Sequence, residues 1–96
     1  MGCVVLGKDK IDAFAKKHPQ ARQPLLAWHA EAGGAAWQTT QDIKARHAHA
    51  GFLSDNRVIF NIHFNDYRLT VRVFFARGHM LVEWVGTHAE YDKQKF

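Results

Sequence analysis

The spacing of apolar residues changes near the middle of the chain. In the first half they recur at steps of three and four, and from Arg57 onward they alternate with polar residues. The first spacing is typical of amphipathic helices, and the second is typical of strands with one buried face. The sequence therefore predicts helices first and a sheet afterwards, an order that favours an α+β domain.

Two helices are predicted in the first half. The earlier one carries apolar residues at helical spacing over 11–18, with Asp9 placed to cap its start and Pro19 to stop it. The later one spans 20–32, where a proline near the start is tolerable, and the glycine pair at 33–34 ends it. Both helices have an apolar side that must be buried against another element.

Shorter elements are predicted on either side of these helices. The apolar run at 3–6 fits a buried strand. Thr39, followed three residues later by Asp42, resembles an acidic capping box and predicts a short helix that ends near His47. Glycine and a Ser-Asp-Asn cluster indicate a loop over 48–56.

The second half predicts a meander of three strands. They cover 57–64, 67–76 and 79–86, and tight turns at 65–66 and 77–78 join them. With the helices that precede it, this small and mainly antiparallel sheet would bury one face and leave the other open.

Side-chain parity assigns two rows of the hairpin to opposite faces, because successive residues of a strand point to opposite sides of a sheet. One row is apolar: Val58, Phe60, Ile62 and Phe64 in the first strand, and Tyr67, Leu69, Val71, Val73 and Phe75 in the second. A register that buries both apolar rows places a polar row together on the other face. Its members are Arg57, Asn61, Arg68 and Arg72. By parity alone, this face is either a solvated surface with incidental charges or a binding surface.

Composition narrows the class of protein. A chain of 96 residues gives one domain, which we expect over 1–96. No apolar run approaches the roughly 18–20 residues that cross a bilayer, and the start lacks the pattern of a secretion signal, so we expect a cytoplasmic protein without membrane contact. The single cysteine, Cys3, excludes an internal disulfide and a Cys-rich zinc site.

Charge points to a polyanionic partner. Thirteen Lys and Arg against nine Asp and Glu give a formal net charge of +4. Such an excess favours nucleic acid or an acidic protein, and charge alone does not separate the two.

The C-terminal motif Gly-Thr-His-Ala-Glu-Tyr-Asp at 86–92 resembles the HigB branch of the RelE-like toxins of bacterial toxin–antitoxin modules. Further blocks resemble the same family in order and spacing, at 17–21, 24–28, 42–45, 56–62 and 67–69, together with Trp37. The resemblance spans nearly the whole chain. It implies a RelE-like fold, with two or three N-terminal helices packed on one face of a small, mainly antiparallel sheet.

The resemblance also implies an activity. Such toxins cleave messenger RNA, typically on the ribosome, by attack of a ribose 2′-hydroxyl on the adjacent phosphate, and they need no metal or other cofactor. The reaction requires a base, cations that stabilise the charged transition state, and an acid for the departing 5′ oxygen. Partners implied are messenger RNA, the ribosome and a HigA-like helix-turn-helix antitoxin.

The candidate catalytic residues are Arg68, Arg72, His88 and Tyr91. The two arginines suit the phosphate charge, because a guanidinium stays ionised and grips phosphate oxygens with two hydrogen bonds. His88 suits acid or base work near neutral pH, and Tyr91 suits proton donation or base stacking. Lys93 is an RNA-binding candidate and a substitute proton donor.

Arg57 and Asn61 fit RNA positioning better than chemistry. Plainer interpretations stay open: His88 as a turn residue bonded to backbone, Tyr91 as a core tyrosine, and the whole protein as a non-catalytic RNA- or protein-binding relative. We expect no metal at the His47-x-His49 pair, since no third ligand is close in sequence. Tryptophans 28, 37 and 84 are expected in the core, although the face of Trp84 cannot be assigned.

Overall fold

A computed structural model describes residues 4–63 and 66–94. The elements in chain order are β1 (Val4–Leu6), α1 (Lys8–Lys17), the 3-10 turn η1 (Pro19–Ala21), α2 (Arg22–Gly34), α3 (Thr40–Arg46), β2 (Gly51–Phe52), β3 (Arg57–Ile62), β4 (Tyr67–Phe74), the 3-10 turn η2 (Phe75–Arg77), β5 (His79–Thr87) and α4 (His88–Asp92).

The strands form one five-stranded mixed sheet in the order β1-β5-β4-β3-β2. The meander β3-β4-β5 is antiparallel throughout, as predicted, and β1 joins the free edge of β5 in parallel. The predicted α+β class is therefore confirmed. None of the helices in 4–63 and 66–94 has the length and apolarity needed to cross a membrane.

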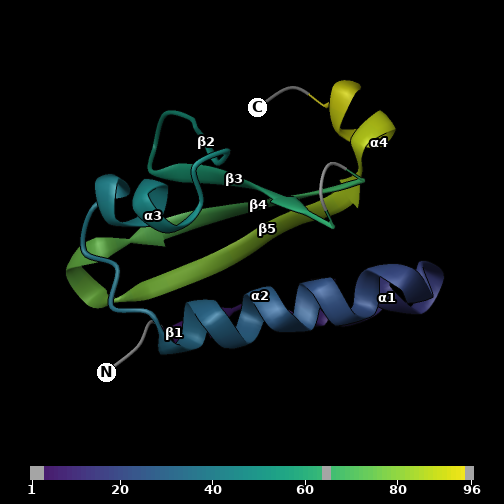
Figure 1. Ribbon diagram of the computed structural model, residues 1–96, viewed down its shortest axis with the longest axis horizontal. Helices are drawn as coiled ribbons and strands as arrows, with labels where there is room; N and C mark the ends of the chain where they lie inside the picture. Colours follow the sequence, from purple (N-terminus) through teal and green to yellow (C-terminus); the bar gives the residue numbers. More distant parts are fainter. Residues whose placement is uncertain (1–3, 64–65, 95–96) are drawn as a thin grey trace.

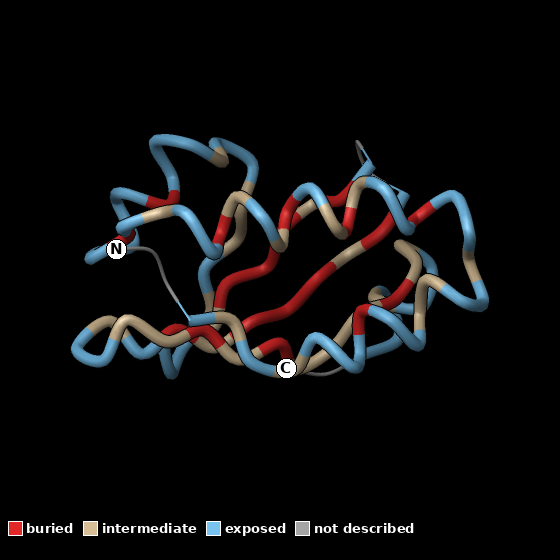
Figure 2. Tube along the Cα trace, turned by 90° about the horizontal axis from the view of Figure 1, so that it is seen from below, coloured by how far each residue is buried: buried red, intermediate tan, exposed pale blue. Residues whose placement is uncertain are grey.

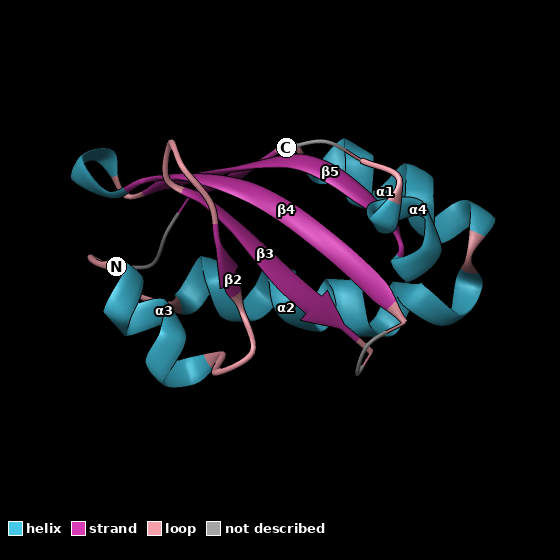
Figure 3. Cartoon of the chain, turned by 90° about the horizontal axis from the view of Figure 1, so that it is seen from above, coloured by secondary structure: helices cyan, strands magenta, loops and turns pink. Residues whose placement is uncertain are grey.

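Helices α1 and α2 cover one side of the sheet, whereas α4 follows β5 onto the other side (Figure 1). Seen from above, the strands lie in front of α2, and α3 lies near the β2 edge (Figure 3). Buried residues follow the central strands and the inward side of the helices (Figure 2). The fully buried side chains of this core include Ile11, Leu25, Ile43, Phe60 and Leu69.

The helix boundaries differ from the prediction in two places. Asp9 does not cap α1: the N-cap is Gly7, with φ of 86°, and Asp9 lies in the first turn. A Cβ at Gly7 would lie 2.7 Å from the carbonyl oxygen of Val82, so sterics as well as φ require glycine there. The predicted helix at 20–32 begins instead with a 3-10 turn, and its final glycines belong to the last turn of α2.

The shorter elements agree more closely with the prediction. Both hydrogen bonds of the Thr39–Asp42 capping box are present at the start of α3. The predicted loop at 48–56 contains the two-residue strand β2, which is too short for periodicity to reveal. Strand β4 ends at Phe74, earlier than expected, because the chain turns through η2. Three residues of predicted elements lie outside the described residues: Cys3 of the strand at 3–6, Phe64 of the strand at 57–64 and Asn65 of the turn at 65–66.

A β-bulge in β5 decides which side chains reach the open face. Thr70 pairs with Trp84, but the next residue of β4, Val71, pairs with Val82, so Glu83 is the extra residue. An extra residue shifts the alternation of side chains by one position. Val82 therefore stays in the core, and Trp84 moves to the opposite face although it is only two residues away.

Candidate nucleic-acid interface

The polar row of the hairpin lies on the face opposite α1 and α2, as parity predicts. In the ladder between β3 and β4, Arg57 is directly opposite Arg72, and Asn61 is directly opposite Arg68. All four are half-buried, and their neighbours Val58, Leu69 and similar residues point into the core. We call this side of the sheet the open face.

One end of the open face carries an aromatic and cationic cluster. The guanidinium carbon of Arg68 lies 5.7 Å from the centre of the Tyr91 ring, within the range of a cation–π contact. The rings of Trp84 and Tyr91 are 6.0 Å apart between centroids. A Cβ at Gly86, which pairs with Arg68, would lie 2.3 Å from the Trp84 ring. The Trp84 indole therefore lies along β5 on the open face, over a position where only glycine leaves room.

Helix α4 places His88 and Tyr91 at this end, which we call the α4 cluster: Arg68, Trp84, His88 and Tyr91. The helix starts with a second capping box, in which Thr87 and Glu90 satisfy each other's backbone N–H groups at 3.1 and 2.8 Å. The hydrogen bond from the Thr87 backbone lowers the pKa of the Glu90 carboxyl below its usual value. Residues three apart share one side of a helix, so the cap holds His88 and Tyr91 as neighbours.

The backbone around His88 is fixed as well. Its N–H donates to the carbonyl of Asp66 at 3.0 Å, which ties α4 to the residue just before β4. The imidazole Nδ1 is 3.8 Å from a carboxylate oxygen of Asp92, one turn further along α4, and the side chain is 45% exposed. The imidazole is therefore accessible and has a carboxylate close by.

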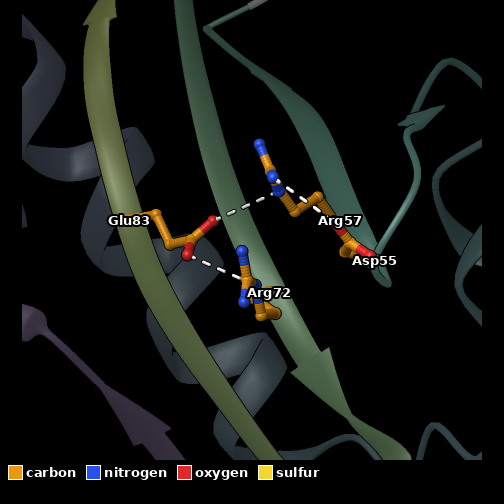
Figure 4. Close-up of polar contacts among 4 residues, drawn as sticks. All are labelled: Asp55, Arg57, Arg72 and Glu83. Atoms are coloured by element: carbon orange, nitrogen blue, oxygen red, sulfur yellow. Dashed lines mark ion pairs between the residues drawn. The ribbon is translucent and has the colours of Figure 1, made fainter. Parts of the chain in front are cut away.

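The other end of the open face carries the arginine pair, Arg57 and Arg72, which also contacts two carboxylates (Figure 4). Glu83 reaches across β4 with its two oxygens, 3.3 Å from Arg72 Nε and 3.9 Å from Arg57 Nε. Asp55 lies 3.6 Å from a terminal nitrogen of Arg57. This end is therefore much less positive than the arginines alone suggest.

The predicted catalytic residues thus fall into two groups. Arg68 contacts Tyr91, and His88 lies one turn before Tyr91 on α4, whereas Arg72 belongs to the arginine pair. Arg72 is five residues along β4 from Tyr67, the partner of Thr87, which amounts to roughly 16 Å of strand. The backbone positions of Arg72 and His88 are therefore well separated on the open face.

The remaining predicted residues take separate positions. The Asn61 side-chain amide donates to the carbonyl of His49 at 3.3 Å, which fastens the preceding loop to β3. Lys93 is the exposed C-cap residue of α4. Trp28 and Trp37 are in the core, as expected, whereas the half-buried Trp84 is on the open face.

Sequence reasoning missed Glu83 and left the face of Trp84 unassigned. Strict alternation from Val82 would put Trp84 in the core, and the bulge reverses this. No local sequence signal marks the bulge, since it arises from the pairing with β4. The sequence did carry one signal: Glu83 is an isolated acidic residue between apolar ones, which indicates a polar side chain on the exposed side of this strand.

His47, the first of the two histidines considered for a metal, contacts Glu31 and two core aromatic rings. His47 Nε2 is 3.0 Å from a carboxylate oxygen of Glu31, and its ring packs edge-on against Trp37 and Phe60. In the part of the chain that the structure describes, no three His, Cys, Asp or Glu side chains gather in a way that could hold a metal ion.

Comparison with known proteins gives one family match. A family model described as HigB_toxin, the RelE-like toxic component of a toxin–antitoxin system, matches residues 21–94. The matched segment is well over half of the chain and includes both the α4 cluster and the arginine pair. Comparison with curated proteins gives no significant match.

Proposed function

This chain belongs to the HigB toxins, the RelE-like toxic components of toxin–antitoxin systems, and we propose that it is an endoribonuclease that cuts messenger RNA without a metal ion. Membership in the family implies an antitoxin as its partner. In the proposed reaction a ribose 2′-hydroxyl attacks the adjacent phosphorus, the bond to the 5′ oxygen breaks, and the products are a 2′,3′-cyclic phosphate and a 5′-hydroxyl.

The observation that carries this proposal is the Arg68–Tyr91 contact at 5.7 Å beside His88. The three groups come from β4 and α4, and together they offer a permanent cation, a phenol and an imidazole. A phosphorane-like transition state gains negative charge on its oxygens. A fixed guanidinium therefore stabilises the transition state more than the ground state. The Tyr91 ring holds the Arg68 guanidinium in place before RNA arrives.

Proton transfer falls to His88 and Tyr91 in this proposal. One removes the proton of the 2′-hydroxyl and the other protonates the departing 5′ oxygen, and imidazole is suited to either task near neutral pH. Lys93, at the end of the same helix, is the substitute donor if Tyr91 serves only to stack on a base.

The arginine pair and Asn61 hold the RNA strand rather than the reacting phosphate. Arg72 lies four residues along β4 from Arg68, or roughly 13 Å, a spacing that suits contact with a different phosphate of the same strand. Phosphate contacts of this kind fix the register of a bound strand without reading its sequence.

The finer identity of the partners is also proposed. The formal charge of +4 and the open face fit messenger RNA presented on the ribosome in the cytoplasm. The antitoxin is proposed to be a helix-turn-helix protein of the HigA type.

The test is the chemistry of RNA ends after brief production of the protein in cells and after incubation with translating ribosomes. The wild type is expected to leave 2′,3′-cyclic phosphate and 5′-hydroxyl ends, with or without a chelator. His88→Ala and Arg68→Ala should each reduce the cleavage rate by about 10²–10⁴-fold, because each removes a group that acts in the transition state.

The matched control is His79→Ala, since His79 is a half-buried histidine at the opposite end of β5. It should cleave like the wild type. A folded wild-type protein that binds RNA and leaves it intact would instead identify a non-catalytic RNA-binding relative. Full cleavage by His88→Ala would move proton transfer to Tyr91 or Lys93.

A further inference from the structure

The arginine pair is ion-paired with a carboxylate of the protein itself, that of Glu83. Arg57 and Arg72 are directly opposite each other in the ladder, an arrangement in which like charges destabilise a sheet. Glu83, on the neighbouring strand β5, bridges the two arginines and places one oxygen toward each Nε (Figure 4). The bulge is what brings this carboxylate to the open face, so the position of Glu83 depends on an irregularity of the strand.

The contact between Glu83 and the arginines is loose. Its distances of 3.3 and 3.9 Å exceed the roughly 2.7–2.9 Å of a hydrogen bond between charged groups. Neither Nε–H has a hydrogen-bond partner among the described residues, although both are buried. Each guanidinium also carries four N–H donors besides Nε–H. The pair can therefore donate hydrogen bonds to an anion that fits between the two side chains more closely than Glu83 does.

The setting of the pair strengthens its attraction for anions. The side chains of Arg57, Arg72 and Glu83 are 22%, 35% and 27% exposed, so water and salt screen their charges less than those of fully exposed groups. A backbone phosphate offers two non-bridging oxygens, each able to accept more than one hydrogen bond from the two forks, whereas the carboxylate is tethered to β5.

We propose that Glu83 is a resident counter-ion: in the free protein it occupies the anion position between Arg57 and Arg72, and a backbone phosphate of bound RNA displaces it. This inference rests on the proposed function, since it assumes that RNA is the ligand of the open face. Glu83 then limits the affinity for RNA, because each binding event breaks an existing ion pair. It also limits the number of counter-ions released on binding.

The test is Glu83→Gln, which removes the charge and keeps the shape. The probe is a short unstructured 2′-O-methyl oligoribonucleotide, which lacks the attacking hydroxyl and is not consumed. The variant should bind it severalfold more tightly than the wild type. The plot of log K against log salt concentration should also be steeper, because the arginine pair meets the phosphate with one more net positive charge in the variant.

Glu31→Gln is the matched control. The Glu31 side chain is 26% exposed and is ion-paired with Arg46 and His47, but it is carried by α2 in the helical layer. It changes the net charge of the protein by the same amount and should gain little affinity. Placed in an Arg72→Gln background, Glu83→Gln should also gain little, because the position it vacates has lost one of its two cations.

Several results would overturn the inference. The first is an equal gain in RNA affinity in Glu31→Gln. The second is a loss of RNA affinity in Glu83→Gln, which would make Glu83 a positioning residue for the arginines. The third is an equal gain of Glu83→Gln in affinity for an oligoglutamate peptide, which would assign the site to an acidic protein. If Glu83→Gln does not fold, the Nε–H signals of Arg57 and Arg72 in wild-type NMR spectra decide: they should shift on addition of the oligonucleotide, and unchanged signals reject the proposal. A wild type that binds no RNA at all would count against the proposed function instead.

Discussion

At the scale of single residues, the absence of a side chain at Gly86 decides where the Trp84 ring lies on the open face. Gly86 lies under the Trp84 ring, where a Cβ would approach an indole carbon to 2.3 Å. Real Cβ atoms do not come this close, so the absence of a side chain at 86 is what allows the Trp84 ring to lie over this position, tilted against the Tyr91 ring. A residue that contributes no chemistry therefore shapes the α4 cluster.

The substitution Gly86→Ala tests this packing. We expect it to lower the free energy of unfolding by about 1–3 kcal/mol, because the rigid indole must leave its position. Urea unfolding measures the change. In a Trp84→Ala background most of the cost should disappear, since the two sites interact directly.

Gly33→Ala provides the contrast for that measurement. Gly33 lies in α2, and no atom of the described residues that could obstruct a methyl group there comes within 4 Å of its place. Alanine at this position should therefore stabilise the helix by about 0.5–1 kcal/mol. An equal loss of stability in both glycine variants would mean that the Trp84 contact is not the cause.

At the scale of elements, α4 shows how a helix of one turn can hold functional groups. A helix this short is not stable by itself. Two features fix it: the Thr87–Glu90 capping box and the bond from the His88 N–H to the Asp66 carbonyl. The same Thr-x-x-acid pattern that begins α3 thus also begins the helix that carries His88 and Tyr91.

The cap predicts a pH dependence of α4. The pKa of Glu90 is lowered in the folded protein, chiefly by the hydrogen bond from the Thr87 backbone. A carboxyl with a lowered pKa contributes stability above its unfolded pKa, and this contribution is lost as the pH falls through the folded value. Glu90→Gln should therefore reduce the hydrogen-exchange protection of α4 at neutral pH, and the difference from wild type should vanish in acid.

Asp92→Asn is the control for this pH profile, because Asp92 is a carboxylate of the same helix outside its capping box. Its effect on α4 protection should be small across the range. If the Glu90→Gln difference persists at a pH where both forms are uncharged, the cap charge is not the source of the protection.

At the scale of the whole molecule, one core cluster joins the helical layer to the sheet. It includes Ile11 and Leu25 from the helices, Phe60 and Leu69 from the meander, and Met80 from β5. Helices α1 and α2 and the meander bury their apolar sides against each other. Each of them would expose its apolar side without the others, so none is expected to fold alone. The open face is held by this core rather than by its own contacts.

Leu25→Ala should therefore destabilise the protein as a unit, by about 2–5 kcal/mol, since Leu25 is fully buried. The transitions followed by far-ultraviolet circular dichroism and by tryptophan fluorescence should shift together, because Trp28 and Trp37 lie in the same cluster. Leu6→Ala, at a 46% exposed leucine of β1, should change stability little. Separate transitions in the two signals would indicate that the helices and sheet unfold independently.

The sequence by itself determined the features that depend on neighbours along the chain. Helical spacing, strand alternation and the Thr39–Asp42 cap are set within a few residues, and so is the shared face of Arg57, Asn61, Arg68 and Arg72, because burying both apolar rows puts this polar row on the other side. The exact pairing of Arg57 with Arg72 is not set in this way, since a shift of two residues keeps the same faces. Only the tertiary structure decided the bulge, the face of Trp84 and the contact of Glu83 with the arginine pair. The physical reason is that a bulge is a compromise between two strands and the layer packed on them, which no stretch of one strand encodes alone.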